Sequence, residues 1–144
     1  MSVSHILRAK GTGTITGKST DKVRSIAQTL AEKRIGAIVI VNATGGIEGI
    51  VSERDIVSCI AKEGAVTLDH PVSQVMTKKV RTCSETDSET ELMAIMTENR
   101  IRHLPVVANG KLIGMISIGD VVKYRIEAIE REANEMKAYI ASAG

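Results

Sequence analysis

The chain contains one sequence pattern twice, and this internal repeat limits its possible folds more than any other feature of its 144 residues. The segment 49–57 returns as 114–122, with the glycine, a serine, an aspartate and the final valine identical. Further upstream, Thr16 matches Thr82 at an offset of 66 rather than 65, so the copies differ by one residue in between. A copy of about 65 residues buries little apolar surface alone, so we expect the two to pack together through their sheets.

The one-residue difference falls where each copy predicts a β-hairpin. The aliphatic run 38–41 and the returning run 47–51 enclose residues 42–46, which include an asparagine and two glycines that tolerate a turn. The second copy has a shorter turn at residues 108–110. Length changes between related repeats are expected at hairpin tips, which supports this alignment.

An amphipathic helix is predicted before each hairpin, and a second helix after it. Asp21 and Asp87 precede the first helices, where a carboxylate can accept hydrogen bonds from the unpaired N–H groups of the first turn. The second helices are expected to start near Asp55 and Asp120. Each half thus has the order strand, helix, strand, strand, helix. This order predicts an α/β (α+β) fold of two pseudo-twofold-related motifs with small sheets packed between helices.

A polar stretch at residues 63–71 joins the copies, and we place the first motif at residues 1–68 and the second at 69–144. The final helix extends past the repeat with an apolar stripe whose residues step by four and three. The stripe consists of Val122, Ile126, Ile129, Ala133, Met136 and Ile140. Such a stripe can cover the core of its own domain or pair with a second subunit. We favour pairing, and therefore a homodimer.

Charge and composition argue against several classes of function. Nineteen basic and 17 acidic residues give a net charge of +2, which creates no strong attraction to nucleic acid or to an anionic membrane. The chain has no Phe or Trp, so it offers few stacking platforms for single-stranded bases. The amino terminus leads into no extended apolar segment, and we therefore expect a cytoplasmic protein without membrane association.

Metal and catalytic chemistry have little support in the sequence. Cys59 and Cys83 form no C-x-x-C pair, and no histidine has ligand spacing near them, so we expect neither a metal site nor a disulfide. The nearest candidates for catalysis are Cys83 with its polar neighbours and His103 with Asp120. No motif fixes their geometry or supplies an oxyanion hole, so we expect no enzyme and no catalytic residue.

Both copies contain a strand that ends in Gly-x-x-Ser-x-x-Asp and runs directly into a helix. Ser52 with Asp55, and Ser117 with Asp120, therefore lie beside unpaired N–H groups at a helix start. A helix N-terminus and a hydroxyl can bind phosphate oxygens, and a carboxylate can accept hydrogen bonds from both hydroxyls of a ribose. Alternatively, these side chains only cap their helices. The two roles are compatible because a carboxylate has two oxygens.

Residues 102–107, followed after a short turn by 114–120, resemble the signature of the CBS motif, which is named for cystathionine β-synthase. Residues 75–77 and 80–82 resemble the opening segment of that motif. The two copies cover nearly the entire chain, an arrangement called a CBS pair or Bateman module. The resemblance implies a pseudo-twofold α/β module with two clefts that bind AMP, ADP, ATP, NAD(H) or S-adenosylmethionine.

The resemblance also implies roles for individual residues. Asp55 and Asp120 would hold ribose hydroxyls, and Ser52 and Ser117 would contact phosphate or ribose. Thr16 and Thr82 would lie near the adenine or the sugar, and the backbone around Ile38 and Pro105 would border the base. The residues expected to contact phosphate are Lys18, Arg54, Arg102 and His103. For this last group, the plain alternative is a solvated surface charge or an ordinary buried histidine.

The first copy departs from the family pattern. Gly36 and Ala37 stand where the second copy has Arg102 and His103, which predicts that the site of the first repeat lacks one phosphate contact of its own. In addition, neither copy has the proline that often precedes the first helix of the motif.

The sequence thus predicts a regulatory module that senses adenosine-containing nucleotides and passes the signal to an unidentified effector protein or through its own oligomer. Three alternatives stay open. The ligand could be S-adenosylmethionine, or the chain could be a structural dimerisation scaffold, or it could be a nucleic-acid-associated module that senses no nucleotide. The near-neutral charge argues against the last.

Overall fold

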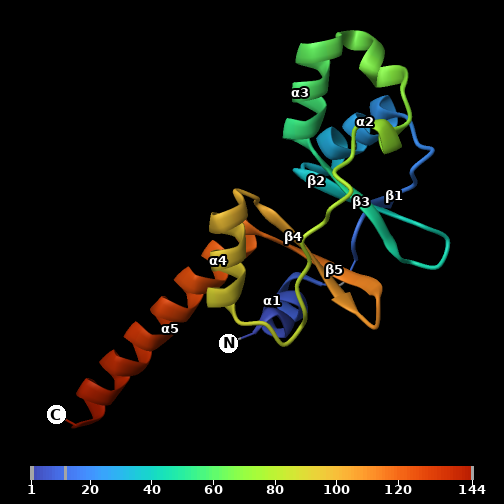
Figure 1. Ribbon diagram of the computed structural model, residues 1–144. Helices are drawn as coiled ribbons and strands as arrows, with labels where there is room; N and C mark the ends of the chain where they lie inside the picture. The colour runs from blue at the N-terminus through green and yellow to red at the C-terminus, as the bar shows by residue number, and fades with distance from the viewer. Residues whose placement is uncertain (1, 12, 144) are drawn as a thin grey trace.

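The computed structural model describes residues 2–11 and 13–143 of the chain, which form two halves of similar build (Figure 1). The elements of the first half are β1 (Thr16–Gly17), α2 (Val23–Lys33), β2 (Ala37–Val41), β3 (Ile47–Ser52) and α3 (Glu53–Glu63). Those of the second half are α4 (Glu89–Asn99), β4 (His103–Ala108), β5 (Lys111–Ser117) and α5 (Ile118–Ala143). The predicted α/β class and the predicted hairpins are confirmed.

The sheets differ slightly between the halves. In the first half, β1 is parallel to β2, and β2 is antiparallel to β3. In the second half, β4 and β5 pair alone, and the expected first strand is reduced to an isolated parallel bridge between Cys83 and Val106. The Cys83 N–H donates to the Pro105 carbonyl at 2.9 Å, so the position of the missing strand is kept although its length is not.

Each half has its own apolar core between its sheet and its helices. In the first half, Val23, Ile26 and Leu30 of α2 pack against Ile38 and Ile40 of β2. The second core is built in the same way from α4, β4 and β5, with Leu92, Leu104 and Ile116 fully buried. Aliphatic side chains therefore supply both cores, as expected from a chain without Phe or Trp.

The segments that lead into the two repeats are exchanged between the halves. Helix α1 (Val3–Lys10) precedes the first repeat but packs on β5 and α5 of the second half, and the Val3 N–H donates to the Asp87 carbonyl at 2.9 Å (Figure 1). The short 3₁₀ helices η1 (Ala65–Asp69) and η2 (Val72–Gln74) pack on the first half. There the Val72 N–H donates to the Asp21 carbonyl at 2.7 Å, the equivalent bond.

The predicted capping role of Asp21 and Asp87 is wrong. Helix α2 has Lys22 at its N-cap without a side-chain bond, and α4 is capped by Ser88, whose hydroxyl accepts from the Glu91 N–H. The two aspartates instead accept backbone hydrogen bonds from three residues upstream, at 2.9 Å from Lys18 and 2.8 Å from Ser84. Each carboxylate therefore closes the turn before its helix.

Helix α5 extends beyond the second half (Figure 1). Val121 and Ala128 are buried against the domain, and Arg125 forms an ion pair with Glu89 of α4 at 2.8 Å. The predicted apolar stripe lies on a different face. Its exposed fractions rise from 46% at Val122 to 64% at Ile140, so the stripe does not cover the core of its own domain.

The structure offers no candidate for a membrane span. Within residues 2–11 and 13–143, no helix combines the length and the apolar character needed to cross a bilayer.

Candidate functional site

The repeated serine and aspartate form reciprocal caps at the starts of α3 and α5. In the first half, the Ser52 N–H and the Ser52 hydroxyl donate to Oδ2 of Asp55 at 2.8 and 3.0 Å, and the Asp55 N–H donates back to the hydroxyl. In the second half, the Ser117 N–H donates to Oδ2 of Asp120 at 2.9 Å. Both Ser–Asp pairs therefore cap their helices, as the alternative reading expected. These bonds use only one oxygen of each carboxylate, so the other is available for a ligand.

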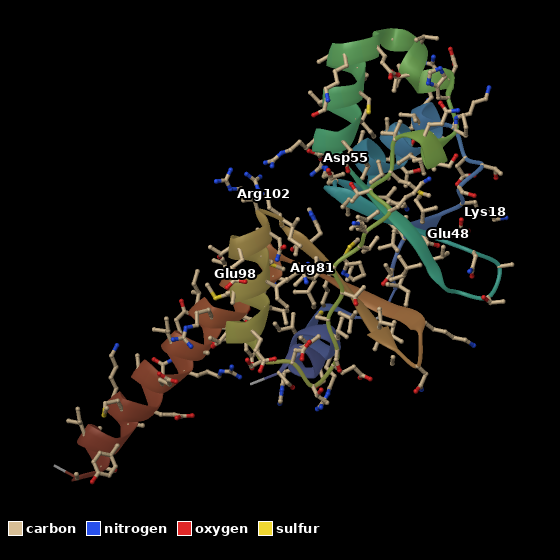
Figure 2. All side chains as sticks on the ribbon, viewed as in Figure 1. Lys18, Glu48, Asp55, Arg81, Glu98 and Arg102 are labelled. Atoms are coloured by element: carbon tan, nitrogen blue, oxygen red, sulfur yellow. The ribbon has the colours of Figure 1, made fainter. Side chains whose placement is uncertain are left out.

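A first cleft of about 550 Å³ lies between the halves beside the Ser52–Asp55 cap. Its volume falls within the range of small-molecule sites, roughly 300–1,000 Å³. The first half contributes Ser52, Arg54 and Asp55, while β4 and the residues before it contribute Arg102 and His103. Figure 2 shows Arg102 at the end of the second half that faces Asp55.

Positive charge dominates this first cleft. Two acidic side chains, Glu53 and Asp55, also line it. The cationic lining residues are Arg54, Lys79, Arg81, Arg100 and Arg102. A cleft with this excess of cations, together with the N-terminus of α3, favours an anionic ligand.

A second cleft of about 340 Å³ lies beside the Ser117–Asp120 cap. The second half supplies Ser117, Asp120 and His103, and the first half supplies residues 34–37. The two clefts are thus built in the same way: each combines the Ser–Asp cap of one half with the segment between the first helix and the hairpin of the other half.

Lys10 enters the second cleft from the end of α1. Its Nζ donates to Oδ2 of Asp120 at 2.6 Å and to the Met115 carbonyl at 2.8 Å. Burial alone would raise the pKa of Asp120, but hydrogen bonds from Lys10 and Ser117 outweigh burial and hold that pKa below its usual 3.8. The carboxylate is therefore charged and paired with Lys10.

His103 lines both clefts and lies between them. Its ring packs on Gly36, where an added Cβ would lie 3.2 Å from Nε2, so the glycine makes room for the imidazole. Burial, followed by the charge of Lys10, lowers the pKa of His103 from its usual 6.5. The imidazole is therefore neutral at neutral pH, and a bound phosphate in either cleft would favour its protonation.

The structure brings together some of the residues proposed from sequence and separates others. The residues found in the clefts are Ser52, Arg54, Asp55, Arg102, His103, Ser117 and Asp120. Those found outside the described linings are Thr16, Lys18, Ile38, Thr82 and Pro105. The side chain of Ile38 is fully buried in the first core, and Lys18 lies on the surface away from Asp55 (Figure 2).

Sequence reasoning missed five cationic residues that line the clefts. Arg34 and Arg100 end α2 and α4 in the left-handed conformation, with φ of 54° and 52°, and each enters the cleft that holds the cap of the other half. They match each other at an offset of 66, so the internal repeat that singled out the serine and aspartate at an offset of 65 also marks this pair. Lys10, Lys79 and Arg81 precede the aligned copies, and no local pattern marks them.

The prediction that the first repeat has the poorer site assumed that each repeat builds its own cleft. Because the contributions are crossed, Arg102 and His103 lie with the Ser52–Asp55 cap, and Gly36 and Ala37 line the cleft of the other cap as well. The cleft with more cationic side chains is therefore the one that holds the first Ser–Asp cap.

Of the sequence candidates for catalysis, His103 and Asp120 share the second cleft, whereas Cys83 lines neither of the two described clefts. Burial, and then the charge of Asp87, raises the pKa of the Cys83 thiol to about 12, so it is a poor nucleophile at neutral pH. Among the described residues, no three His, Cys, Asp or Glu side chains cluster in a way that could hold a metal ion, and Cys59 and Cys83 are free thiols.

Comparison with known proteins gives consistent matches over both halves. The model of the CBS domain family matches residues 14–62 and 72–127. The mitochondrial CBS domain-containing protein CBSX3 of Arabidopsis thaliana is 30% identical over 146 residues, which cover 96% of this chain and 71% of that protein. A crystal structure of a CBS-domain-containing protein from Agrobacterium tumefaciens superposes with a TM-score of 0.83 at 44% identity, covering 86% of this chain and 92% of the other. A CBS domain protein from Pyrobaculum aerophilum, solved in complex with AMP, gives a TM-score of 0.74 at 29% identity and covers 83% and 89%.

Proposed function

This chain belongs to the CBS domain family, with one domain in each half, and we propose on that basis that it is a regulatory module that binds an adenosine-containing nucleotide. The ligands we propose are AMP, ADP, ATP or NAD(H), held in the clefts between the halves. The single observation that carries the proposal is the paired architecture of those clefts. Each offers a carboxylate with a spare oxygen beside a helix N-terminus and cations from the opposite half.

In the first cleft we assign Asp55 to the ribose hydroxyls and Ser52, with the N-terminus of α3, to phosphate or ribose. Arg54 and Arg102 are proposed phosphate contacts, since guanidinium groups bind phosphate oxygens in a bidentate manner. Arg100 joins this group because it lines the same wall. The AMP complex of the Pyrobaculum relative supports an adenylate as the ligand class.

In the second cleft, Asp120 and Ser117 have the corresponding roles, and Arg34 is the proposed phosphate contact. Thr16, Lys18, Thr82 and the backbone around Ile38 and Pro105 stay proposed ligand contacts, although they are not among the residues that line the two described clefts. Ile38 and Pro105 are buried in β2 and β4, so the proposed contact with the base comes from the backbone at these positions.

We propose that the module acts without catalysis and passes its state on through contacts. The exposed apolar stripe of α5 is the proposed surface for a second copy of this chain, giving a homodimer. Glu132 and Lys137 flank the stripe on opposite sides and are five residues apart, the spacing that pairs opposite charges between two parallel identical helices. An effector protein would then read the shape of the dimer.

A cytoplasmic location is part of the proposal. It is supported by the two free cysteines, which are typical of a reducing compartment.

Calorimetric titration with AMP, ATP, NAD, NADH and S-adenosylmethionine tests the ligand, with Asp55→Ala and Asp120→Ala as site variants. We expect micromolar binding of at least one adenylate, lost from the first cleft in one variant and from the second in the other. Glu98→Ala is the control, because it removes an exposed carboxylate outside both clefts and should leave binding unchanged. Each alanine also removes a helix cap worth about 1 kcal/mol, so thermal melts must show that the variants are folded. No heat from any of these ligands would contradict the proposal.

A further inference from the structure

We propose that Lys10 makes the second cleft selective for phosphorylated ligands: its ammonium group pairs with Asp120 and transfers to the phosphate when the hydroxyls of a ribose take both oxygens of that carboxylate. The inference rests on the proposed nucleotide-binding role of the clefts and adds a selectivity filter that only one of them has.

The position of Lys10 is set by a packed element. Lys10 is the last residue of α1, and Leu7, one turn earlier, is buried against Gly114 of β5. Its ammonium group donates to Asp120 and to the Met115 carbonyl, so two of its three donors are used inside the cleft. The chain therefore places its own cation on the carboxylate that a ribose would need.

Oδ1 of Asp120 is available, but a ribose whose two hydroxyls bind both oxygens of the carboxylate competes with this ammonium group for Oδ2. A nucleoside offers no anion in exchange, so the ion pair is lost without replacement. A nucleotide offers phosphate oxygens, which accept charge-assisted hydrogen bonds from an amine close by. The second cleft should therefore prefer AMP to adenosine more strongly than the N-terminus of α5 alone would make it. Because 41% of the Lys10 side chain is exposed, solvent moderates the effect.

The first cleft has a lysine, Lys79, at the position equivalent to Lys10, but in the part of the chain that the structure describes this lysine is not paired with the aspartate of the cap. Leu7 and Met76 each pack on the glycine of a hairpin strand, Gly114 and Gly49, and they are 69 residues apart in the chain. The same offset takes Lys10 to Lys79, which lines the first cleft.

Among the described residues, however, Lys79 forms no ion pair with Asp55, whose Oδ2 accepts from the backbone and hydroxyl of Ser52. In the second cleft, by contrast, Oδ2 of Asp120 is already paired with a lysine.

The second cleft can be observed separately, because Met115 lines it and does not line the first cleft. The experiment titrates AMP, and separately adenosine, into the full chain carrying ¹³C-labelled methionine methyl groups, and follows the Met115 signal. The quantity compared is the ratio of the dissociation constants of adenosine and AMP. The variants are Lys10→Met, the conservative Lys10→Arg, and the control Arg8→Met. The control removes the same charge from an exposed position of α1 that does not line the cleft.

We expect Lys10→Met to lower the adenosine-to-AMP ratio on the order of tenfold, the usual strength of a charge-assisted hydrogen bond. Lys10→Arg and Arg8→Met should keep the wild-type ratio. An unchanged ratio in Lys10→Met would overturn the inference. The inference would also be overturned if AMP left the Met115 signal unchanged while calorimetry detected AMP binding that Asp55→Ala abolishes. The proposed function would then stand, with the first cleft as its site. If neither method detects AMP or adenosine in the wild-type protein, the proposed function fails as well.

Discussion

Gly114→Ala should destabilise the protein, although the same change is favourable at most strand positions. A Cβ at residue 114 would lie 2.6 Å from Cδ2 of Leu7 and 3.5 Å from its Cδ1. Leu7 is only 5% exposed and belongs to the second core, so it has no solvent into which to turn. Overpacking of this kind costs roughly 1–3 kcal/mol, against a gain of about 0.5–1 kcal/mol from replacing glycine within a strand. We expect a net loss of about 1 kcal/mol in the free energy of unfolding.

Urea unfolding followed by far-UV circular dichroism measures this loss, with Gly119→Ala as the matched control. Gly119 lies in the first turn of α5, where the nearest atom to an added Cβ is the Ser117 hydroxyl oxygen at an ordinary 3.6 Å. The control should therefore gain roughly 0.5–1 kcal/mol, because alanine favours the helix over glycine. The two substitutions are chemically identical and should have opposite signs.

A double-mutant cycle with Leu7→Ala tests the stated cause. Alone, Leu7→Ala should cost about 2–5 kcal/mol through the cavity that it leaves. Combined with Gly114→Ala it should cost less than the sum, because the new methyl group enters the space vacated by the leucine. A stabilising Gly114→Ala, or strict additivity in the cycle, would refute the argument that α1 is held against β5 by this contact.

The Cys83 thiol should resist iodoacetamide at neutral pH while the half-buried Cys59 reacts, because burial is the main cause that raises the pKa of Cys83 to about 12; preferential labelling of Cys83 in the folded protein, seen by mass spectrometry, would be the contrary result. The His103 imidazole should titrate below 6.5 by NMR, since burial first and then nearby cations lower its pKa. The contribution of neutral His103 to the free energy of unfolding is therefore complete above pH 6.5 and is lost as the pH falls through the lower pKa of the folded state. A His103 pKa of 6.5 or above would be evidence against its burial beside Lys10. Ile140→Glu should shift the sedimentation of a dimer toward the monomer at micromolar concentration, whereas Ala138→Glu on another face of α5 should not; equal effects would count against the apolar stripe as the interface.

Features that depend on neighbours within a few residues were predictable. The reciprocal Ser52–Asp55 and Ser117–Asp120 caps span three residues each, so their geometry follows from the strand-to-helix junction wherever it occurs. The prediction failed locally at Asp21, because an aspartate before a helix can accept from the backbone on either side, and spacing alone does not choose.

The internal repeat determined, from sequence alone, that the chain has two similar α/β halves and that each carries one Ser–Asp junction suited to a nucleotide. Only the tertiary structure decided which side chains share a cleft. Arg100 faces the cap of the first half, and Lys10 reaches Asp120 across 110 positions of the chain. Both placements depend on the exchange of lead-in segments and on the docking of the halves. That docking is set by buried contacts such as Leu7 on Gly114, and no local periodicity encodes contacts between residues so distant in the chain.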